Sequence, residues 1–277
     1  MLLKTCIPSP HGRGNETVYD ESYRLARELP PDTFAFTADF FEQSGILASI
    51  AALTSARNPD GRVEARLYKV NAYTTGGFFK SHRDTPKSDN HIGTVVVGLP
   101  SAFQGGALRV SHDGKDILFD WGDVLSKSSE IILPWAFLFS DVEHEIYPVT
   151  SGVRLTVVYD IFATTGSPNA QPSVNMSVDA KTLPLYNDIV GIFSDKTFLP
   201  MGGQLAITLS HSYPMNTETG DIENTGSNFS FKGVDAALYR VIKSLGFKST
   251  LKAVFDVAQV WKGHYYARQM ESLLGRR

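Results

Sequence analysis

The chain contains almost no cysteine, because Cys6 is the single thiol among 277 residues. One thiol cannot form a disulfide within the chain, and it cannot supply a zinc or iron–sulfur site built from cysteines. The first residues also lack an apolar stretch long enough for a secretory signal. Because disulfides and signal peptides are typical of secreted proteins, we expect an intracellular, cytoplasmic protein.

The chain also lacks an excess of positive charge, long apolar runs and internal repeats. Its 26 Lys and Arg residues stand against 29 Asp and Glu residues, a formal net charge of −3. Without a basic excess to hold phosphate groups, we expect no nucleic-acid partner. No apolar run approaches the ~18 residues that span a bilayer, so we expect no membrane partner either.

The pattern that is present is mainly β. From Arg62 onward apolar and polar residues alternate, with Val63, Ala65 and Leu67 on one side of the expected strand. Further short β-like runs follow at close intervals, at 94–99, 106–111, 116–121, 131–140 and 153–162. Short strands separated by Gly, Pro, Asn and Asp, without helices between them, predict a sandwich, barrel or jelly roll.

Helical patterns flank this β region on both sides. Helical spacing or helix-ending residues predict helices at 19–29, 42–56, 183–195 and 233–245. A strand is expected near 203–210, and polar loops at 163–181 and 212–228. The segment 163–181 could also be a linker between two domains, but the last 95 residues look too small and mixed for a second core, so we expect a single domain over 1–277. It would consist of an N-terminal arm and helices at 1–61, a β core at 62–162, and C-terminal strands and helices at 163–277 that pack on the core.

One group of residues in the β core has metal-ligand spacing. His82 and Asp84 are two residues apart, so on a strand both side chains leave the same face. His144 lies 60 residues beyond Asp84, just before an expected strand. Two imidazoles and one carboxylate with open coordination positions are the ligand set of non-haem Fe(II) oxygenases. The His-x-Asp pair alone is weak support, because such pairs also occur on ordinary surfaces.

A possible anion site follows this group along the chain. Arg154 lies ten residues after His144, and Thr156 is two residues further on, so both share a strand face. A guanidinium and a hydroxyl on one face can hold a carboxylate. Arg154 lies in the apolar run 153–159, where an unpaired charge is costly, so its expected partner is an anion. A structural salt bridge to a buried Asp or Glu is the alternative.

Together these stretches resemble a known family. LYKVNAYTTGGFFKSHRDTPKSDNHIGTVVVGLP and PWAFLFSDVEHEIYPVTSGVRLTVVYDIF resemble the 2-oxoglutarate/Fe(II)-dependent dioxygenases of the prolyl-4-hydroxylase-like branch, in particular fungal members of largely unassigned substrate. The resemblance extends to ETVYDESYRLAREL near the N-terminus. It also reaches LPLYNDIV, FLPMGGQL and FKGVDAALYRVIKSLG in the C-terminal part.

The resemblance implies a fold and a set of site residues. The fold is a double-stranded β-helix, or jelly roll, with flanking helices, which agrees with the strand pattern. Fe(II) would be held by His82, Asp84 and His144. The distal carboxylate of 2-oxoglutarate would be bound by Arg154 with help from Thr156. Tyr73, nine residues before His82, matches a family tyrosine that donates a hydrogen bond to the cosubstrate.

The activity implied is oxidation, chiefly hydroxylation, of an unactivated C–H bond with O₂ and 2-oxoglutarate, releasing succinate and CO₂. Halogenating relatives have a small residue at the position of Asp84, so its presence favours hydroxylation. We expect a small-molecule substrate. A protein or peptide hydroxylase of the prolyl type is one alternative. A non-catalytic jelly-roll protein that binds a metal or ligand is another, and zinc-dependent hydrolysis with the same ligands is a third.

Other polar residues near the His-x-Asp pair are expected to lie in loops and on the solvent-exposed face of the strand. His91 follows a polar stretch and is expected in a solvated loop, with a place at the mouth of the site as the alternative. Lys80, Arg83 and Lys87 are expected on the strand exterior and in loops, although they could also attract an acidic substrate.

Overall fold

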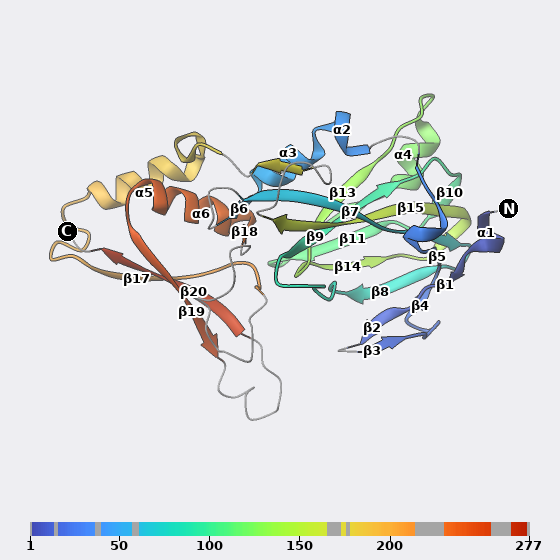
Figure 1. The fold of residues 1–277 in the computed structure, drawn as a ribbon, viewed down its shortest axis with the longest axis horizontal. Coiled ribbons are helices and arrows are strands. Elements are labelled where there is room, and N and C mark those ends of the chain that lie inside the picture. Colours follow the sequence, from blue (N-terminus) through green and yellow to red (C-terminus); the bar gives the residue numbers. More distant parts are fainter. Residues whose placement is uncertain are drawn as a thin grey trace. The chain divides into compact units, whose positions relative to one another are not determined.

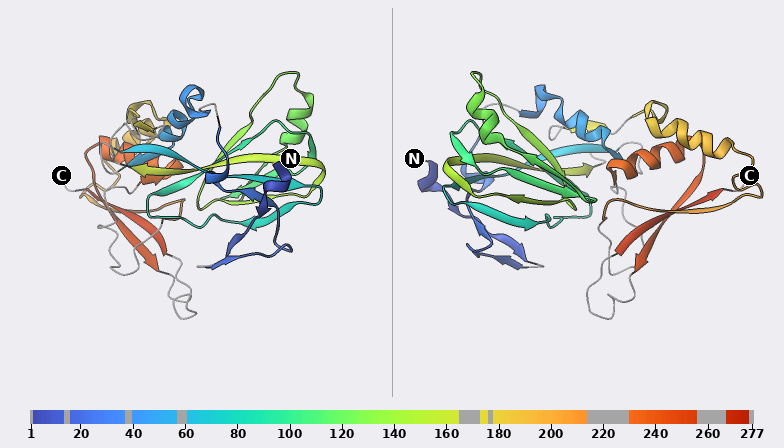
Figure 2. Two further views of the ribbon diagram at one scale, coloured as in Figure 1. Left: turned by 45° about the vertical axis from the view of Figure 1, so that its right-hand side comes forward. Right: turned by 180° about the vertical axis from the view of Figure 1, so that it is seen from behind.

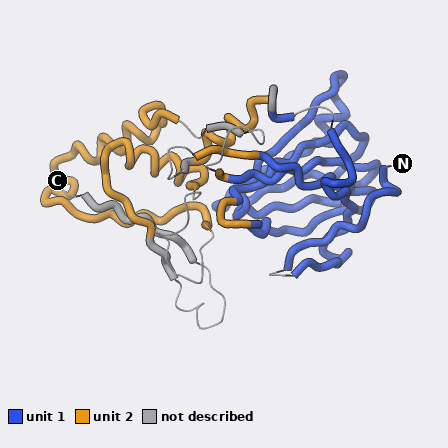
Figure 3. The backbone as a smooth tube through the Cα atoms, in the orientation of Figure 1, with its two compact units in different colours: residues 1–43, 65–87, 91–162 blue, residues 44–64, 88–90, 163–277 orange. Residues whose placement is uncertain are grey.

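The computed structural model describes residues 2–13, 16–36, 40–56, 61–164, 173–175, 178–213, 230–255 and 267–275. The chain forms two compact units, which Figure 3 shows in different colours. Unit 1 contains residues 1–43, 65–87 and 91–162, and unit 2 contains residues 44–64, 88–90 and 163–277. The expectation of a single domain over 1–277 stays a prediction.

The larger sheet provides one wall of unit 1. Its strands lie in the order β1-β5-β7-β15-β9-β13, and β10 pairs with β15 (Figure 1). The bounds are β1 Ile7–Pro8, β5 Arg27–Leu29, β7 Arg62–Thr74, β9 His91–Gly98, β10 Phe103–Gly105, β13 Trp135–Phe139 and β15 Val149–Thr164. Strand β9, which lies between β15 and β13, is buried along nearly its whole length, which explains its run of three valines, Val95, Val96 and Val97.

A second sheet provides the opposite wall. Its strands lie in the order β12-β11-β14-β8-β4, and each pair is antiparallel. Figure 2 shows the ribbon from two further sides. The bounds are β4 Arg24–Leu25, β8 Phe78–His82, β11 Leu108–His112, β12 Lys115–Phe119 and β14 Glu143–Ile146. A separate hairpin of β2 (His11–Arg13) and β3 (Glu16–Val18) precedes β4 in the chain.

A hydrophobic core joins the two sheets. Its buried members come from both walls, and they are Tyr73, Phe103, Leu108, Trp121, Ala136, Ile146 and Val149. Trp121 is the first residue of α4 (Trp121–Lys127), whose N-cap Asp120 accepts a hydrogen bond from the Asp123 backbone N–H. Two sheets packed across an apolar core confirm that this unit is mainly β.

Unit 2 combines helices with short sheets. Its elements are α3 Ile46–Ala52, β6 Thr54–Ala56, β16 Ser173–Asn175, the 3₁₀ helix η2 Ala180–Thr182, α5 Pro184–Ser194, β17 Gly203–Thr208, β18 Ser230–Lys232, α6 Gly233–Ser244, β19 Lys248–Phe255 and β20 Ala267–Gly275. Strand β6 pairs with β18, and β20 lies between β17 and β19. The Arg240 guanidinium on α6 donates to the backbone carbonyls of Ala51, Ala52 and Thr54, which ties α6 to the end of α3.

The chain also contains short elements near the N-terminus. They are α1 Leu2–Thr5, the 3₁₀ helix η1 Pro31–Thr33 and α2 Phe40–Ser44. No helix among the described residues has the length and apolar character needed to cross a bilayer.

Most of the expected elements are confirmed, and the differences have physical causes. Helices at 183–195 and 233–245 correspond to α5 and α6, and Gly246 adopts a left-handed φ of 78° where α6 ends. The helix expected at 42–56 is divided by Gly45, with φ 68°, into α2 and α3, and its last residues form β6. The polar loops expected at 163–181 and 212–228 lie mostly outside the described residues.

The helix expected at 19–29 is wrong. This segment contains β4, which pairs with β8, and β5, which pairs with β7. Hydrogen bonds to strands distant in sequence outweigh the local helical spacing. The strand expected at 116–121 ends at Phe119, and the helix α4 that follows was not expected.

Gly93 tests the packing of the larger sheet. A Cβ at this position in β9 would lie 2.1 Å from the Leu138 carbonyl oxygen and 2.9 Å from the Phe139 Cα. We expect Gly93→Ala to lower the free energy of unfolding by about 3 kcal/mol, measured by urea denaturation. The control is Gly114→Ala, where φ is +72° and no described atom lies within 4 Å of the added Cβ. Its cost should be only about 1 kcal/mol, and equal costs would contradict this account of β9.

Candidate active site

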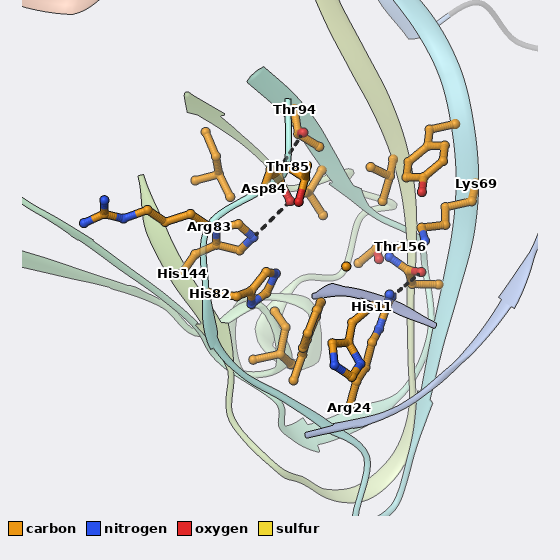
Figure 4. A pocket seen from close by; sticks show the side chains of 18 of the residues that line it. His11, Arg24, Lys69, His82, Arg83, Asp84, Thr85, Thr94, His144 and Thr156 are labelled. Atoms are coloured by element: carbon orange, nitrogen blue, oxygen red, sulfur yellow. Dashed lines mark hydrogen bonds and ion pairs between the residues drawn. The ribbon is translucent and has the colours of Figure 1, made fainter. Parts of the chain in front are cut away.

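The pairing of β8 with β14 brings the two expected histidine ligands together. His82 and His144 are direct partners in the antiparallel register, and their ring centroids lie 4.2 Å apart. Asp84 follows just beyond the end of β8, not on the strand as expected, and its Oδ1 lies 3.8 Å from His144 Nε2 (Figure 4). The ligand atoms of all three residues lie within 4.8 Å of one another, a spacing that can hold a metal ion.

Backbone carbonyls orient both imidazoles. His82 Nδ1 lies 2.7 Å from the Lys80 carbonyl oxygen, and His144 Nδ1 lies 3.1 Å from the Val142 carbonyl oxygen. Because a carbonyl oxygen only accepts hydrogen bonds, this network assigns the ring proton to Nδ1 in both residues. The Nε2 lone pairs are then free for a metal, the usual arrangement for histidine ligands in proteins.

Two of the expected ligands, His82 and Asp84, have pKa values shifted toward the protonation state that a metal requires. Burial, together with the neighbouring His144, lowers the pKa of His82 to about 3. Burial alone would raise the pKa of Asp84, but the two imidazoles and a hydrogen bond from Thr94 outweigh it and lower that pKa. The Thr94 hydroxyl donates to Asp84 Oδ2 over 2.9 Å. A neutral His82 imidazole and an ionised Asp84 carboxylate can bind a cation at neutral pH without first losing protons.

Arg154 and Thr156 lie on β15, and each is only 1% exposed. Arg154 Nε and Nη2 and Thr156 Oγ1 are buried without a hydrogen-bond partner. Burial lowers the pKa of Arg154 to about 10, so the side chain still carries its charge at neutral pH. No carboxylate among the described residues pairs with it, which does not support the alternative of a structural salt bridge. Three unpaired donors on one strand face have the chemistry to hold an anion.

The Arg154 guanidinium is enclosed by aromatic rings. Its Cζ lies 5.6 Å from the ring centre of Tyr73 and 5.3 Å from that of Trp121. Tyr73 is 3% exposed and lines the same cavity as Arg154. The structure therefore places Tyr73 beside Arg154, and its proposed hydrogen bond to a cosubstrate stays a prediction.

A cavity of about 370 Å³ connects these groups. It is lined by His82, Asp84, His144, Tyr73, Arg154 and Thr156 together with residues of both sheets and of the N-terminal segment. In Figure 4 the two histidines and Asp84 lie on one side of this space, and Thr156 lies on the other. The six residues expected at the site thus face a single cavity.

His91 corrects an expectation from the sequence. It is the first residue of β9, is 3% exposed and lines the cavity, so it does not lie in a solvated loop. Its Nε2 lies 3.7 Å from Asp160 Oδ1, and burial lowers its pKa. Lys87, expected as a loop charge, forms an ion pair with Asp160 and lies over the Tyr68 ring.

Sequence reasoning missed several polar residues of the cavity, among them Arg24, Lys69 and Asn71. A signal for two of them was present. Lys69 and Asn71 alternate with apolar residues in β7 and so share a strand face with Tyr73, which was expected at the site. Arg24 was not identified as a cavity residue because its segment was expected to be helical, whereas it forms β4.

Loss of any one of the three expected ligands should abolish tight metal binding. We expect His82→Ala, Asp84→Ala and His144→Ala each to weaken Fe(II) binding by more than about 100-fold, because loss of even an outer partner of a ligand costs 10–100-fold. Anaerobic competition with a chelator measures the affinity, and circular dichroism checks the fold. A folded variant with wild-type affinity would remove that residue from the ligand set.

Thr94 provides a finer test of the same site. Thr94→Val keeps the side-chain shape but removes the hydrogen bond to Asp84, so metal affinity should fall by about 10- to 100-fold. Thr94→Ser keeps the hydroxyl and should bind metal nearly as well as the wild type. The same chelator competition compares the two variants, and equal affinities would show that Thr94 does not orient Asp84.

Comparison with known proteins is consistent with this geometry. Residues 68–159, 92 of the 277, match the family model of the 2OG-Fe(II) oxygenase superfamily. This segment contains all six expected site residues. No curated protein sequence matches the chain.

Several solved structures are similar at low sequence identity. A 2OG-Fe(II) oxygenase family oxidoreductase from Burkholderia pseudomallei is 20% identical, with a TM-score of 0.29, over 35% of this chain and 43% of that chain. A prolyl hydroxylase from Trichoplax adhaerens, solved with a hypoxia inducible factor peptide fragment, is 16% identical, with a TM-score of 0.34, over 55% and 69%. A Pseudomonas putida prolyl-4-hydroxylase is 17% identical, with a TM-score of 0.35, over 58% and 79%. The match to the family model supports a 2OG-Fe(II) oxygenase, an oxidoreductase.

Proposed function

We propose that this protein is an Fe(II)- and 2-oxoglutarate-dependent dioxygenase that hydroxylates a C–H bond of a small molecule. One observation carries the proposal. Three metal-ligating side chains and a buried, unpaired Arg154 with Thr156 line the same cavity. A metal site and a carboxylate site in one cavity are what a bidentate keto acid with a distal carboxylate requires.

The ligand set fits an Fe(II) site with open coordination positions better than it fits a closed structural metal site. His82, Asp84 and His144 offer three donor atoms, which leaves coordination positions for the cosubstrate and O₂. Zinc-dependent hydrolysis with these ligands would not need a buried arginine without a protein partner. A non-catalytic metal site has equally little use for such a group.

The anion site fits the distal carboxylate of 2-oxoglutarate. Arg154 offers Nε and Nη2, two adjacent donors in the planar fork that matches a carboxylate, and Thr156 adds a hydroxyl. Because Arg154 is fully buried, an anion at this position would be held in a low-dielectric environment where the attraction is strong. Tyr73 borders the same part of the cavity and would contact the cosubstrate.

When bound, Fe(II), 2-oxoglutarate and O₂ supply the oxidation of a C–H bond with release of succinate and CO₂. The chain supplies position and exclusion of water. The carbonyls of Lys80 and Val142 fix the two imidazoles, and Thr94 fixes Asp84. Apolar side chains of both sheets, Val96, Leu138, Ile146 and Val158, line the cavity and limit the access of water. With Asp84 as the third ligand, hydroxylation is favoured over halogenation.

The fold and the cavity support the finer parts of the proposal. Two facing sheets of antiparallel strand pairs with the ligands on the smaller sheet agree with a double-stranded β-helix. A volume of about 370 Å³ lies within the usual range for small-molecule sites. Pro10, His11 and Gly12 of the N-terminal segment border the cavity, which favours a small substrate over an extended peptide.

Replacement of Arg154 tests the cosubstrate site. We expect Arg154→Ala to weaken 2-oxoglutarate binding by roughly 30-fold to several thousand-fold, because truncation leaves the carboxylate unpaired. Arg154→Lys keeps the charge without the fork and should be intermediate. Fe(II) affinity should change far less, since Arg154 is not a ligand.

The measurement is an anaerobic titration of 2-oxoglutarate into the Fe(II) protein, followed by its metal-to-ligand charge-transfer absorption. Pyruvate, which lacks the distal carboxylate, serves as the control. Its affinity should be nearly the same in wild type and in Arg154→Ala. A wild-type protein that binds Fe(II) but gives no such absorption with 2-oxoglutarate would overturn the proposed function. Unchanged affinity in folded Arg154→Ala would mean that another group holds the carboxylate.

A further inference from the structure

A second buried arginine faces the same cavity. Arg24 on β4 is 5% exposed and lines the cavity, with its Nη1 donating to the Pro10 carbonyl oxygen over 2.6 Å. Its Nη2 donates to Asn71 Oδ1 over 3.0 Å, whereas its Nε is buried without a partner. Both of these acceptors are neutral, and no carboxylate among the described residues pairs with Arg24. A buried cation with a free donor is costly unless it is paired. An anion bound in the cavity would pair with Arg24.

A second polar atom without a hydrogen-bond partner, an imidazole nitrogen, lines the same cavity. His11 on β2 is 9% exposed, lines the cavity, and has a buried Nδ1 with no hydrogen-bond partner. Its ring packs against Tyr23, the residue before Arg24, with 4.5 Å between the ring centroids. Arg24 Nη1 donates to the carbonyl oxygen of Pro10, the residue before His11, and Figure 4 shows the side chains of Arg24 and His11 at the cavity. In the tautomer of His11 that carries its proton on Nδ1, this nitrogen and Arg24 Nε are two donors that can hold the two oxygens of one carboxylate.

Arg24 lies close to the expected metal site. Its Cζ is 4.4 Å from the ring centre of Phe79, and that ring stacks on His82 with 3.6 Å between centroids. The guanidinium is therefore one aromatic ring away from an expected iron ligand. An anion held by Arg24 would keep the rest of a small molecule near the metal, the placement that a substrate needs.

The charge of the cavity wall favours an acidic substrate. The whole chain has a net charge of −3, but four basic side chains, Arg24, Lys69, Lys87 and Arg154, line the cavity. Arg83 lies at its border, and its exposed side chain points away from the cavity (Figure 4). The two acidic side chains of the lining are Asp84 and Asp160. Glu28 pairs with Lys69, and Asp160 pairs with Lys87. Because Fe(II) and 2-oxoglutarate carry opposite charges of equal size, their binding would leave the positive surplus in place.

The two buried arginines differ in a way that separates their roles. Arg154 shares its strand face with the unpaired hydroxyl of Thr156. Arg24 is held in one orientation by two neutral acceptors and keeps its Nε free. Lys69 lies close enough to Arg24 for their positive charges to repel each other. Burial first, and then this repulsion, lower the pKa of Lys69 to about 8.

We propose that the substrate carries a carboxylate and that Arg24, with His11 as a second donor, binds this carboxylate in the cavity. The proposal rests on the proposed function, because it assigns the substrate class of the same site. It divides the two arginines between two ligands, with Arg154 for the cosubstrate and Arg24 for the substrate.

The experiment compares acids with their amides. The probes are the free amino acids and simple aliphatic monocarboxylic acids, each paired with its primary carboxamide. They are added to the anaerobic wild-type protein saturated with Fe(II) and 2-oxoglutarate, and binding is followed by saturation-transfer NMR and by the change in the charge-transfer absorption. We expect one or more acids to bind at least about 10-fold more tightly than the matching amides. If no acid binds more tightly than its amide, the proposal is wrong.

Variants then assign the preference to Arg24. Arg24→Gln should reduce the affinity for the preferred acid by about 10- to 150-fold, and Arg24→Lys should be intermediate. Neither should change 2-oxoglutarate affinity as Arg154→Ala does. Arg83→Gln is the matched control, because Arg83 is exposed and points away from the cavity in Figure 4, and it should keep the acid preference. Full preference in folded Arg24→Gln would overturn the proposal. A loss of 2-oxoglutarate affinity in that variant as large as in Arg154→Ala would also overturn it.

Two further measurements keep the test decisive. If Arg24→Gln does not fold, His11→Ala replaces it and should lower the affinity for the acid but not for the amide; equal effects on both would count against the proposal. If the wild type gives no charge-transfer absorption with 2-oxoglutarate, the proposed function fails. The acid and amide probes are then compared on the metal-free protein by NMR, where an Arg24-dependent preference would still support the carboxylate site and its absence would refute it.

Discussion

The antiparallel pairing of β8 with β14 is the constraint on which the site depends. It sets His82 directly opposite His144, although most of the β core separates them in sequence. Strand β11 holds β14 from the other side, with Val110 opposite His144, so the position of this histidine is fixed by two neighbours. A shift of the register by one residue would turn one imidazole to the opposite face of the sheet. The carbonyls of Lys80 and Val142, one on each side of the pair, then set the ring orientations.

Around this pair the cavity combines an apolar wall with a few buried charges whose hydrogen bonds differ. Lys87 and Lys69 are neutralised by carboxylates of the chain, so they help to build the wall. Arg154 and Arg24 are not, and each keeps at least one buried donor free. Because buried polar groups in folded proteins are nearly always paired, donors left free in one cavity are the strongest indication of what it binds. The same principle explains why the two arginines point to two different anions.

Local patterns in the sequence identified those parts of the structure that depend on local interactions. Helix α6 follows from its apolar face and from Gly246, and the buried strand β9 follows from its run of three valines. The metal ligands could be found because a short spacing, a distant histidine and Arg154 form a known chemical combination. The segment at 19–29 could not be predicted, because its backbone hydrogen bonds go to β7 and β8, which come later in the chain. His91 follows polar residues, and its burial beside Asp160 and Phe162 depends on a strand about 70 residues away.

The burial of Arg154 has a thermodynamic consequence for the protein without ligands. A fully buried guanidinium with no acidic partner opposes folding, as the lowered pKa of its side chain reflects. The ligand-free fold must therefore be maintained by the packing of Tyr73, Trp121 and the rest of the core around it. An apolar side chain of similar size would suit that core better, as replacements of buried charges in other proteins have shown. The position thus represents a trade-off in which stability of the empty protein is sacrificed for recognition of an anion.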